Sequence, residues 1–217
     1  MSVRIYGALF GAISLLSACD AAGTNTPTQD ALTTTGFVAP SATGVINIGL
    51  EGFPLSRVAQ TFPNSGVGYA FQAGSIANEG LFAVAGVLPG TESALTLPPV
   101  GSATYSGTYN LVEVSNVSLG SQSITGSQNL RSGTLDLAAN FANNTLVSIG
   151  GGALSVNGRV ESGNEMTGTV SYGGVSGDLG GFIGGNRAIG AFHGEGNVGP
   201  GSDDDYMYAG GFIAARN

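Results

Sequence analysis

The second half of the sequence, residues 104–217, is a succession of short segments in which apolar and polar side chains alternate. Alternation with a period of two is typical of a β-strand that buries one face. We expect eight such strands, at residues 104–112, 132–141, 145–149, 154–160, 166–172, 175–183, 187–195 and 206–215. Eight strands close into a barrel whose interior is just wide enough for side chains to fill.

Asparagine and glycine between these segments favour tight hairpins, because both adopt positive φ at low cost. They fall at residues 143–144, 163–164, 173–174 and 185–186. The pair Asn157-Gly158 is either a further turn or a bulge inside a strand. Glycine also recurs on the predicted inner face, where it lets coiled strands bend, at Gly107, Gly133, Gly168 and Gly177. We therefore predict an all-β fold, with an eight-stranded antiparallel up-and-down β-barrel at residues 101–217.

Residues 45–100 are predicted to form a small strand-rich collar. We expect strands at 45–50, 67–73 and 81–88, the last of which could instead be a short helix because Ala-rich apolar runs are ambiguous. The turn residues between them are Pro54, Pro63, Asn64 and Gly66. Three strands make only a marginal sheet, so the collar is expected to pack against the barrel.

The N-terminus has the layout of a secretory signal peptide, which we predict at residues 1–18. Arg4 is followed by an apolar run at 5–16 and then by Ser17-Ala18-Cys19. This run is shorter than the roughly 20 residues that a membrane-spanning helix needs. The motif LSAC at 16–19 resembles a bacterial lipobox, which implies acylation of Cys19 and cleavage before it. The alternative is an ordinary signal peptide that happens to end beside the sole cysteine.

A diacylglyceryl group on Cys19 would anchor the protein stably, whereas a single acyl chain holds a protein only marginally. Residues 19–44 are rich in Thr, Ala, Gly and Pro and show no hydrophobic period. Such a composition buries too little apolar surface to offset chain entropy. We predict that this segment is a flexible tether between the lipid and the folded part.

The charge of the chain excludes nucleic acid as a partner. Six arginines face fourteen acidic residues, there is no lysine, and the net charge is −8. Nucleic-acid affinity depends on basic residues that neutralise phosphates. The acidity is best explained as a contribution to solubility.

No residue pattern predicts catalysis, a cofactor or a metal site, and we expect no enzyme. His193 is the only histidine and shares a strand face with Glu195, but zinc sites draw three or four ligands. We expect His193 to be a strand residue with ordinary hydrogen bonds. Asp203, Asp204 and Asp205 are either a solvated turn or a calcium loop without the spaced ligands of a recognised one.

Four glycine–aromatic motifs resemble the β-barrel domain of transferrin-binding protein B and its relatives, which are Gram-negative lipoproteins. They are YSGTY at 105–109, GTLDL at 133–137 with Asn140-Phe141, GDLGGF at 177–182 and AGGF at 209–212. The resemblance covers about residues 95–217 and implies a barrel with a lipid-anchored N-terminus. That family has two lobes, each with a handle domain and a barrel, whereas this chain has room for one barrel and a collar. No ligand-contacting residue can be transferred from it.

The function predicted from the sequence is a lipid-anchored binding module in the outer membrane of a Gram-negative bacterium, on the surface or the periplasmic face. Its ligand, a protein or a small solute, is not identified. Exposed candidates for contact are Phe192, Tyr206, Tyr208 and the acidic loop 203–205. The alternative is a small transmembrane outer-membrane β-barrel, a pore or a structural element, with apolar residues outward. Short segments and the absence of Trp favour the first hypothesis.

Overall fold

The structure, a computed structural model, describes residues 33–48, 55–76, 80–96, 100–119, 124–161, 163–197 and 205–217. This part of the chain contains twelve strands and a 3-10 helix, Glu92–Ala94. The strands are β1 Thr33–Phe37, β2 Leu55–Asn64, β3 Val67–Ile76, β4 Gly80–Val87, β5 Ser102–Leu119, β6 Ile124–Asn140, β7 Thr145–Ile149, β8 Leu154–Val160, β9 Glu165–Tyr172, β10 Val175–Ile183, β11 Arg187–Asn197 and β12 Asp205–Arg216. None of the described helices has the length and hydropathy of a membrane span.

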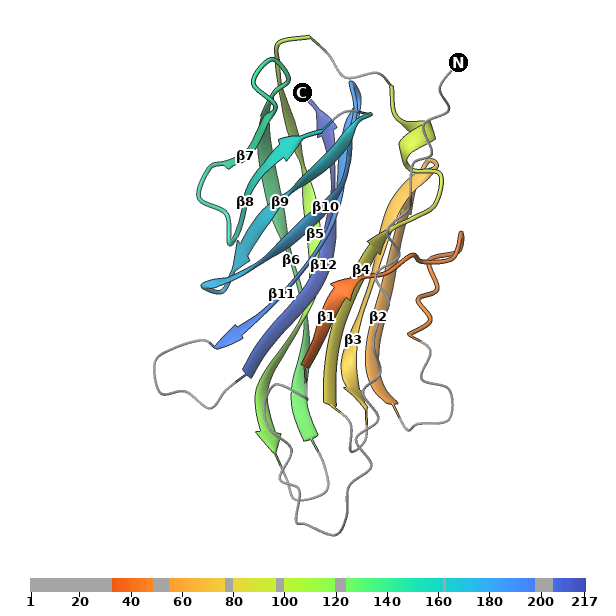
Figure 1. The fold of residues 1–217 in the computed structure, drawn as a ribbon, viewed down its shortest axis with the longest axis vertical. Coiled ribbons are helices and arrows are strands. Elements are labelled where there is room, and N and C mark those ends of the chain that lie inside the picture. The colour runs from red at the N-terminus through yellow and green to blue at the C-terminus, as the bar shows by residue number, and fades with distance from the viewer. Residues whose placement is uncertain are drawn as a thin grey trace, which may run out of the picture.

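Strands β5 to β12 form a closed antiparallel barrel (Figure 1). Consecutive strands are neighbours around it, and β12 closes it by pairing with β5 from Met207↔Val114 to Arg216↔Tyr105. The predicted eight-stranded up-and-down barrel is confirmed, and each predicted segment corresponds to one strand, although β6 ends at Asn140, one residue before the predicted end. Strands β5 and β6 are longer than expected, at 18 and 17 residues.

Side chains fill the interior of the barrel. On β5, Tyr105, Tyr109 and Leu111 are buried inside, while Thr104 and Thr108 are exposed outside, as the alternation predicted. Phe192, Tyr208 and Phe212 join them from β11 and β12, each fully buried. The barrel therefore encloses an apolar core.

Glycines provide the tight turns and the room that this core needs. Gly173 and Gly174, with φ of 59° and 84°, form the turn between β9 and β10, where residues with a Cβ would be strained. Gly133 lies on the inner face, as predicted, against the ring of Tyr109. Asn157-Gly158 is neither a turn nor a bulge, because both residues pair regularly with β9 inside β8.

Strands β1 to β4 form the collar, a separate sheet with the order β1-β4-β3-β2. Strands β3 and β4 agree with the prediction, and β4 is not a helix. The strand expected at 45–50 is wrong in its described part: residues 45–48 are irregular, and Ile46 packs on the collar. Strand β2 was not expected, because Pro63 indicated a turn. β2 is one of the two edge strands of the collar, and a residue without an N–H is tolerated at an edge.

Strand β1 lies inside the segment predicted to be a tether. Residues 33–37 pair in parallel with β4, from Thr33↔Leu81 to Phe37↔Ala85. The prediction of a flexible tether is therefore wrong for these residues. Thr and Phe favour strands, but TTTGF shows no alternation of apolar and polar residues, so the segment becomes recognisable as a strand only through its pairing with β4.

The collar packs face-on against the outer wall of the barrel (Figure 1). Tyr69, Phe71 and Ala83 from the collar share one apolar cluster with outward residues of β5, β11 and β12. The opposite face of the collar is covered by residues 38–48, among which Ile46 contacts the cluster around Phe82. The expectation that the collar packs against the barrel is confirmed.

Replacing Phe212 with alanine should lower the free energy of unfolding by about 3–5 kcal/mol, because it leaves a cavity in a filled interior. Urea denaturation measures the loss. The matched control is Thr167→Ala on the exposed wall of β9, which should change stability by less than about 0.5 kcal/mol. Equal effects of the two substitutions would contradict a packed barrel.

Candidate binding groove

The three aromatic residues predicted to be exposed contacts lie inside the barrel. Phe192 and Tyr208 have no exposed surface, and Tyr206 is 7% exposed. The ring of Tyr208 lies against Gly194, its cross-strand partner on β11. The prediction that these residues bind a partner at the surface is therefore wrong. The other predicted site residues, Cys19 and Asp203–Asp204, lie outside the described part of the chain, as does the side chain of Asp205.

One mouth of the barrel carries an ion pair between Glu113, which is buried, and Arg131, which is exposed. The Glu113 carboxylate accepts hydrogen bonds from Arg131 Nε at 2.8 Å and Nη2 at 2.6 Å. Its second oxygen accepts the Tyr206 hydroxyl at 3.2 Å. Burial, and then the Glu113 charge, raise the pKa of Tyr206 above its ordinary value, so Tyr206 remains a donor. These groups satisfy one another, and the arrangement is a polar plug for the mouth rather than a ligand site.

His193 lies on the outer wall of the barrel beneath β1. It is 8% exposed, and the ring of Phe37 meets it edge-on with 4.6 Å between ring centroids. Its Nδ1 has no hydrogen-bond partner among the described residues, so the expectation of ordinary hydrogen bonds is wrong for that atom. Burial lowers the pKa of His193, and the charges of Asp178 and Glu195 only partly oppose the shift. Within the described residues, no group of three His, Cys, Asp or Glu could hold a metal.

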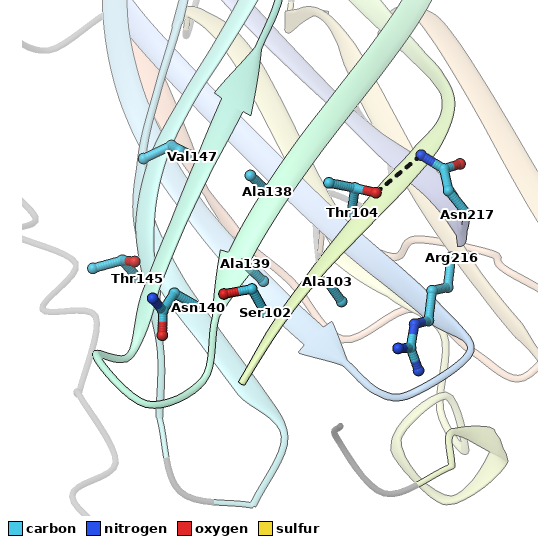
Figure 2. A pocket seen from close by; sticks show the side chains of 10 residues that line it. All are labelled: Ser102, Ala103, Thr104, Ala138, Ala139, Asn140, Thr145, Val147, Arg216 and Asn217. Atoms are coloured by element: carbon cyan, nitrogen blue, oxygen red, sulfur yellow. Dashed lines mark hydrogen bonds between the residues drawn. The ribbon is translucent and has the colours of Figure 1, made fainter. Parts of the chain in front are cut away.

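A shallow hollow of about 390 Å³ lies on the outer wall near the end of β12. Figure 2 shows its lining, which consists of short side chains from β5, β6 and β7 together with Arg216 and Asn217. Asn217 Nδ2 donates to Thr104 Oγ1 at 3.2 Å, and Asn140 Oδ1 accepts two backbone N–H groups of its own turn. Much of the polar surface of this hollow is therefore already engaged.

A second concavity, which we call the junction groove, lies between the collar and the barrel. Its volume is about 430 Å³. Residues from five strands line it: Thr61, Phe62, Pro63 and Asn64 on β2, Tyr69 on β3, Ser106, Gly107, Thr108 and Asn110 on β5, Arg187 on β11, and Ile213 and Ala215 on β12. Both layers of the fold are needed to form it.

The collar side of the junction groove is aromatic. The rings of Phe62 and Tyr69 stack with centroids 5.0 Å apart and an interplanar angle of 23°. Phe71 continues the stack, 5.9 Å from Phe62. Tyr69 is 1% exposed, whereas Phe62 is only partly buried. Stacked rings lose little freedom on binding, so Phe62 offers a preorganised apolar face.

The barrel side of the junction groove is polar. Asn110 Nδ2 donates to the Tyr69 hydroxyl oxygen at 2.9 Å, which leaves the amide oxygen of Asn110 as an acceptor. Burial raises the pKa of Tyr69 to about 12, so its own O–H remains a donor at neutral pH. Thr108 is exposed on the same strand face, two residues away. The barrel side of the groove thus presents both hydrogen-bond donors and hydrogen-bond acceptors.

Arg187 joins the two sides of the junction groove. Its Nη1 donates to the Asn64 backbone oxygen at 3.0 Å and lies 3.4 Å from the Asn64 side-chain oxygen. Both bonds use one nitrogen, and the Nε and Nη2 groups have no hydrogen-bond partner in the described part of the chain. A guanidinium has five N–H donors, so Arg187 retains capacity for an anion.

Sequence reasoning missed the junction groove. Alternation correctly placed Thr108 and Asn110 on the outside of the barrel, but it carried no sign of what covers them. Pro63 and Asn64 were assigned to a turn, and Arg187 was only the first residue of a predicted strand. The available signal was the pair Phe62-Pro63, because a proline that follows an aromatic residue is also compatible with an edge strand.

Replacing His193 with glutamine should remove a pH-dependent loss of stability. The pKa of His193 is lower in the folded chain than its ordinary value of 6.5, so the unfolded state binds more protons. The contribution of His193 to the free energy of unfolding is constant above pH 6.5, and it becomes destabilising as the pH falls below that value. No other histidine titrates in this range. Urea unfolding at pH 7, 6 and 5 should show a steeper loss for the wild type, and parallel profiles would contradict this.

Comparison with solved structures finds similar folds at low identity. Transferrin-binding protein B from Haemophilus parasuis Hp5, in a double-mutant form, aligns over 74% of this chain and 37% of its own, with 13% identity and a TM-score of 0.38. Intact Ap-TbpB, with N and C lobes, aligns over 79% of this chain and 40% of its own, with 13% identity and a TM-score of 0.37. HpuA from Kingella denitrificans, in complex with human haemoglobin, aligns over 73% of this chain and 67% of its own, with 17% identity and a TM-score of 0.32.

The chain spans about two fifths of the length of the two transferrin-binding protein B chains. Its sequence matches no protein-family model and no curated protein. Two of these three solved structures are of transferrin-binding protein B.

Proposed function

We propose that this chain is a lipid-anchored binding module of the outer membrane of a Gram-negative bacterium, which holds its partner on the outer surface of the folded part. The observation that carries the proposal is the contrast between a filled barrel interior and a concave, partly polar outer surface at the junction groove. A filled interior leaves no room for a solute, so a ligand has to bind outside.

The polarity of the barrel argues against a transmembrane pore. A membrane barrel is apolar outside and polar inside. Here Leu135, Val156 and Val170 are buried inside, and the exposed positions on the outside include Thr134, Ser155, Thr167 and Thr169. This wall resembles the solvated face of a soluble sheet. We therefore propose surface binding rather than conduction.

The proposed anchor at Cys19 is close in sequence to the folded part. Strand β1 begins at Thr33, so 33 − 19 = 14 peptide units separate the cysteine from the collar. Fully extended, that length spans at most roughly 50 Å. The collar would then be held within that distance of the membrane.

Replacing Cys19 with serine should abolish lipid labelling and release the chain from the membrane fraction. Cells that express the wild type and the C19S variant are grown with radiolabelled palmitate and then fractionated. We expect label and membrane association for the wild type only, with C19S in the soluble periplasmic fraction. Because Cys19 precedes the described fold, circular dichroism should show the same strand content in both. A C19S chain that resists extraction from the membrane would favour an embedded barrel and overturn the proposal.

Protease added to intact cells then distinguishes the two faces of the outer membrane. Digestion of the wild-type chain on intact cells places the binding module at the cell surface. Digestion only after the outer membrane has been permeabilised places it on the periplasmic side. Thr167→Ala, which leaves Cys19 and the junction groove unchanged, serves as a control for expression and export.

A further inference from the structure

We propose that the junction groove is a site for an acidic sugar, a hexuronate ring that carries one carboxylate and several hydroxyl groups. The inference rests on the proposed function in one respect, that ligands bind on the outer surface. It adds the chemical class of the ligand. Three features of the groove match such a ring. The guanidinium of Arg187 has free N–H donors for the carboxylate, the ring of Phe62 offers an apolar surface to the C–H face of the sugar, and the barrel wall offers donors and acceptors to its hydroxyl groups.

The carboxylate would bind to Arg187. The side chain is held by its bonds to Asn64 through Nη1, and Arg187 is one of the residues that line the groove. Its Nε and Nη2 groups form the pair of parallel donors that binds a carboxylate in bidentate geometry. Within the described residues no carboxylate forms an ion pair with Arg187, so its charge is available to an anionic ligand.

The ring of the sugar would pack on Phe62. One face of a pyranose presents C–H groups, which need an apolar surface at a fixed position. Phe62 is stacked on Tyr69 and Phe71 at 5.0 and 5.9 Å and remains partly exposed. Ligand sites commonly combine such an aromatic surface with a few polar groups that fix orientation.

The hydroxyl groups would bind the barrel wall. The Thr108 hydroxyl can donate, and the Asn110 amide oxygen can accept. A hydroxyl is both a donor and an acceptor, so it can satisfy groups of either kind. A ligand with a carboxylate alone would leave this wall without partners.

The charge of the chain limits the ligand to one or few negative charges. Arg187 is the only basic residue that lines the described groove, and the chain has no lysine and a net charge of −8. A polyphosphate or a nucleic acid would require more cations than this groove holds. A peptide added to the edge of β2 would lack one backbone donor at Pro63. A monoanionic sugar meets neither obstacle.

Isothermal titration calorimetry of the full lipidated chain in detergent tests the inference with three probes. Sodium glucuronate carries the ring and the carboxylate, glucose carries the ring alone, and acetate carries the carboxylate alone. We expect saturable binding of glucuronate, with glucose and acetate each at least tenfold weaker. Equal binding of acetate would reduce the groove to a general anion site, and equal binding of glucose would remove the role of Arg187. Either result overturns the proposal, as does no binding of glucuronate.

Variants locate the binding. R187Q should weaken glucuronate at least tenfold, and T108V, which leaves the Arg187–Asn64 bonds in place, should weaken it severalfold. The matched control is R216Q, which removes the same charge from the hollow of Figure 2 and should leave the affinity within twofold. A loss in R216Q equal to that in R187Q would overturn the assignment to the junction groove. R187Q also removes the hydrogen bonds to Asn64, so its thermal unfolding midpoint is measured without ligand. If R187Q does not fold, the affinity of T108V for glucuronate tests the assignment to the junction groove.

The methyl glycoside of glucuronate distinguishes a free acid from the end of a glycan. If the methyl glycoside binds with the same affinity as glucuronate, the groove is assigned to the ends of glycans. If it binds tenfold more weakly, the groove is assigned to the free acid. The proposed function is tested separately, by palmitate labelling of the wild type and of C19S, where label is expected for the wild type only. If the chain is acylated but does not bind glucuronate, this inference alone is refuted. If the chain binds glucuronate but is not acylated, only the proposed lipid anchor is refuted.

Discussion

The fold depends on the burial of both faces of β12. Tyr208 and Phe212 point into the barrel, whereas Ala209 and Gly211 face the collar. The Tyr69 ring occupies the space that a Cβ at Gly211 would need, so the collar can approach only because that residue is glycine. The same strand closes the barrel by pairing with β5. Barrel closure and collar docking therefore rest on a single strand of small and aromatic residues.

This double burial explains which parts of the sequence could be interpreted. Strand β8, with Val156 inside and Ser155 outside, has one solvated face and keeps a clean period of two, and its bounds were predicted correctly. Where both faces are buried, the alternation is between large and small residues rather than apolar and polar. Tyr206 and Tyr208 then gave no sign of being inside, and their apparent exposure was an error of that kind.

The strands that were missed share a different cause. The polar run of β1 and the proline-containing β2 have weak local signals, and each becomes a strand by pairing with a collar partner already in place. Pairing at a sheet edge tolerates residues that a central strand excludes. The junction groove could not be predicted for a related reason, because Asn64 and Arg187, which span it, are 123 residues apart in sequence.

That long-range contact gives the groove a physical consequence. Arg187 on the barrel and Asn64 on the collar are joined by hydrogen bonds at an exposed site, where such bonds add only modest stability. A ligand that contacts both walls would favour the docked arrangement of the two layers, since anything that binds only the docked state stabilises it. Strand β1, which leads toward the proposed anchor, belongs to the collar. Occupation of the groove would therefore strengthen the connection between the collar and the barrel.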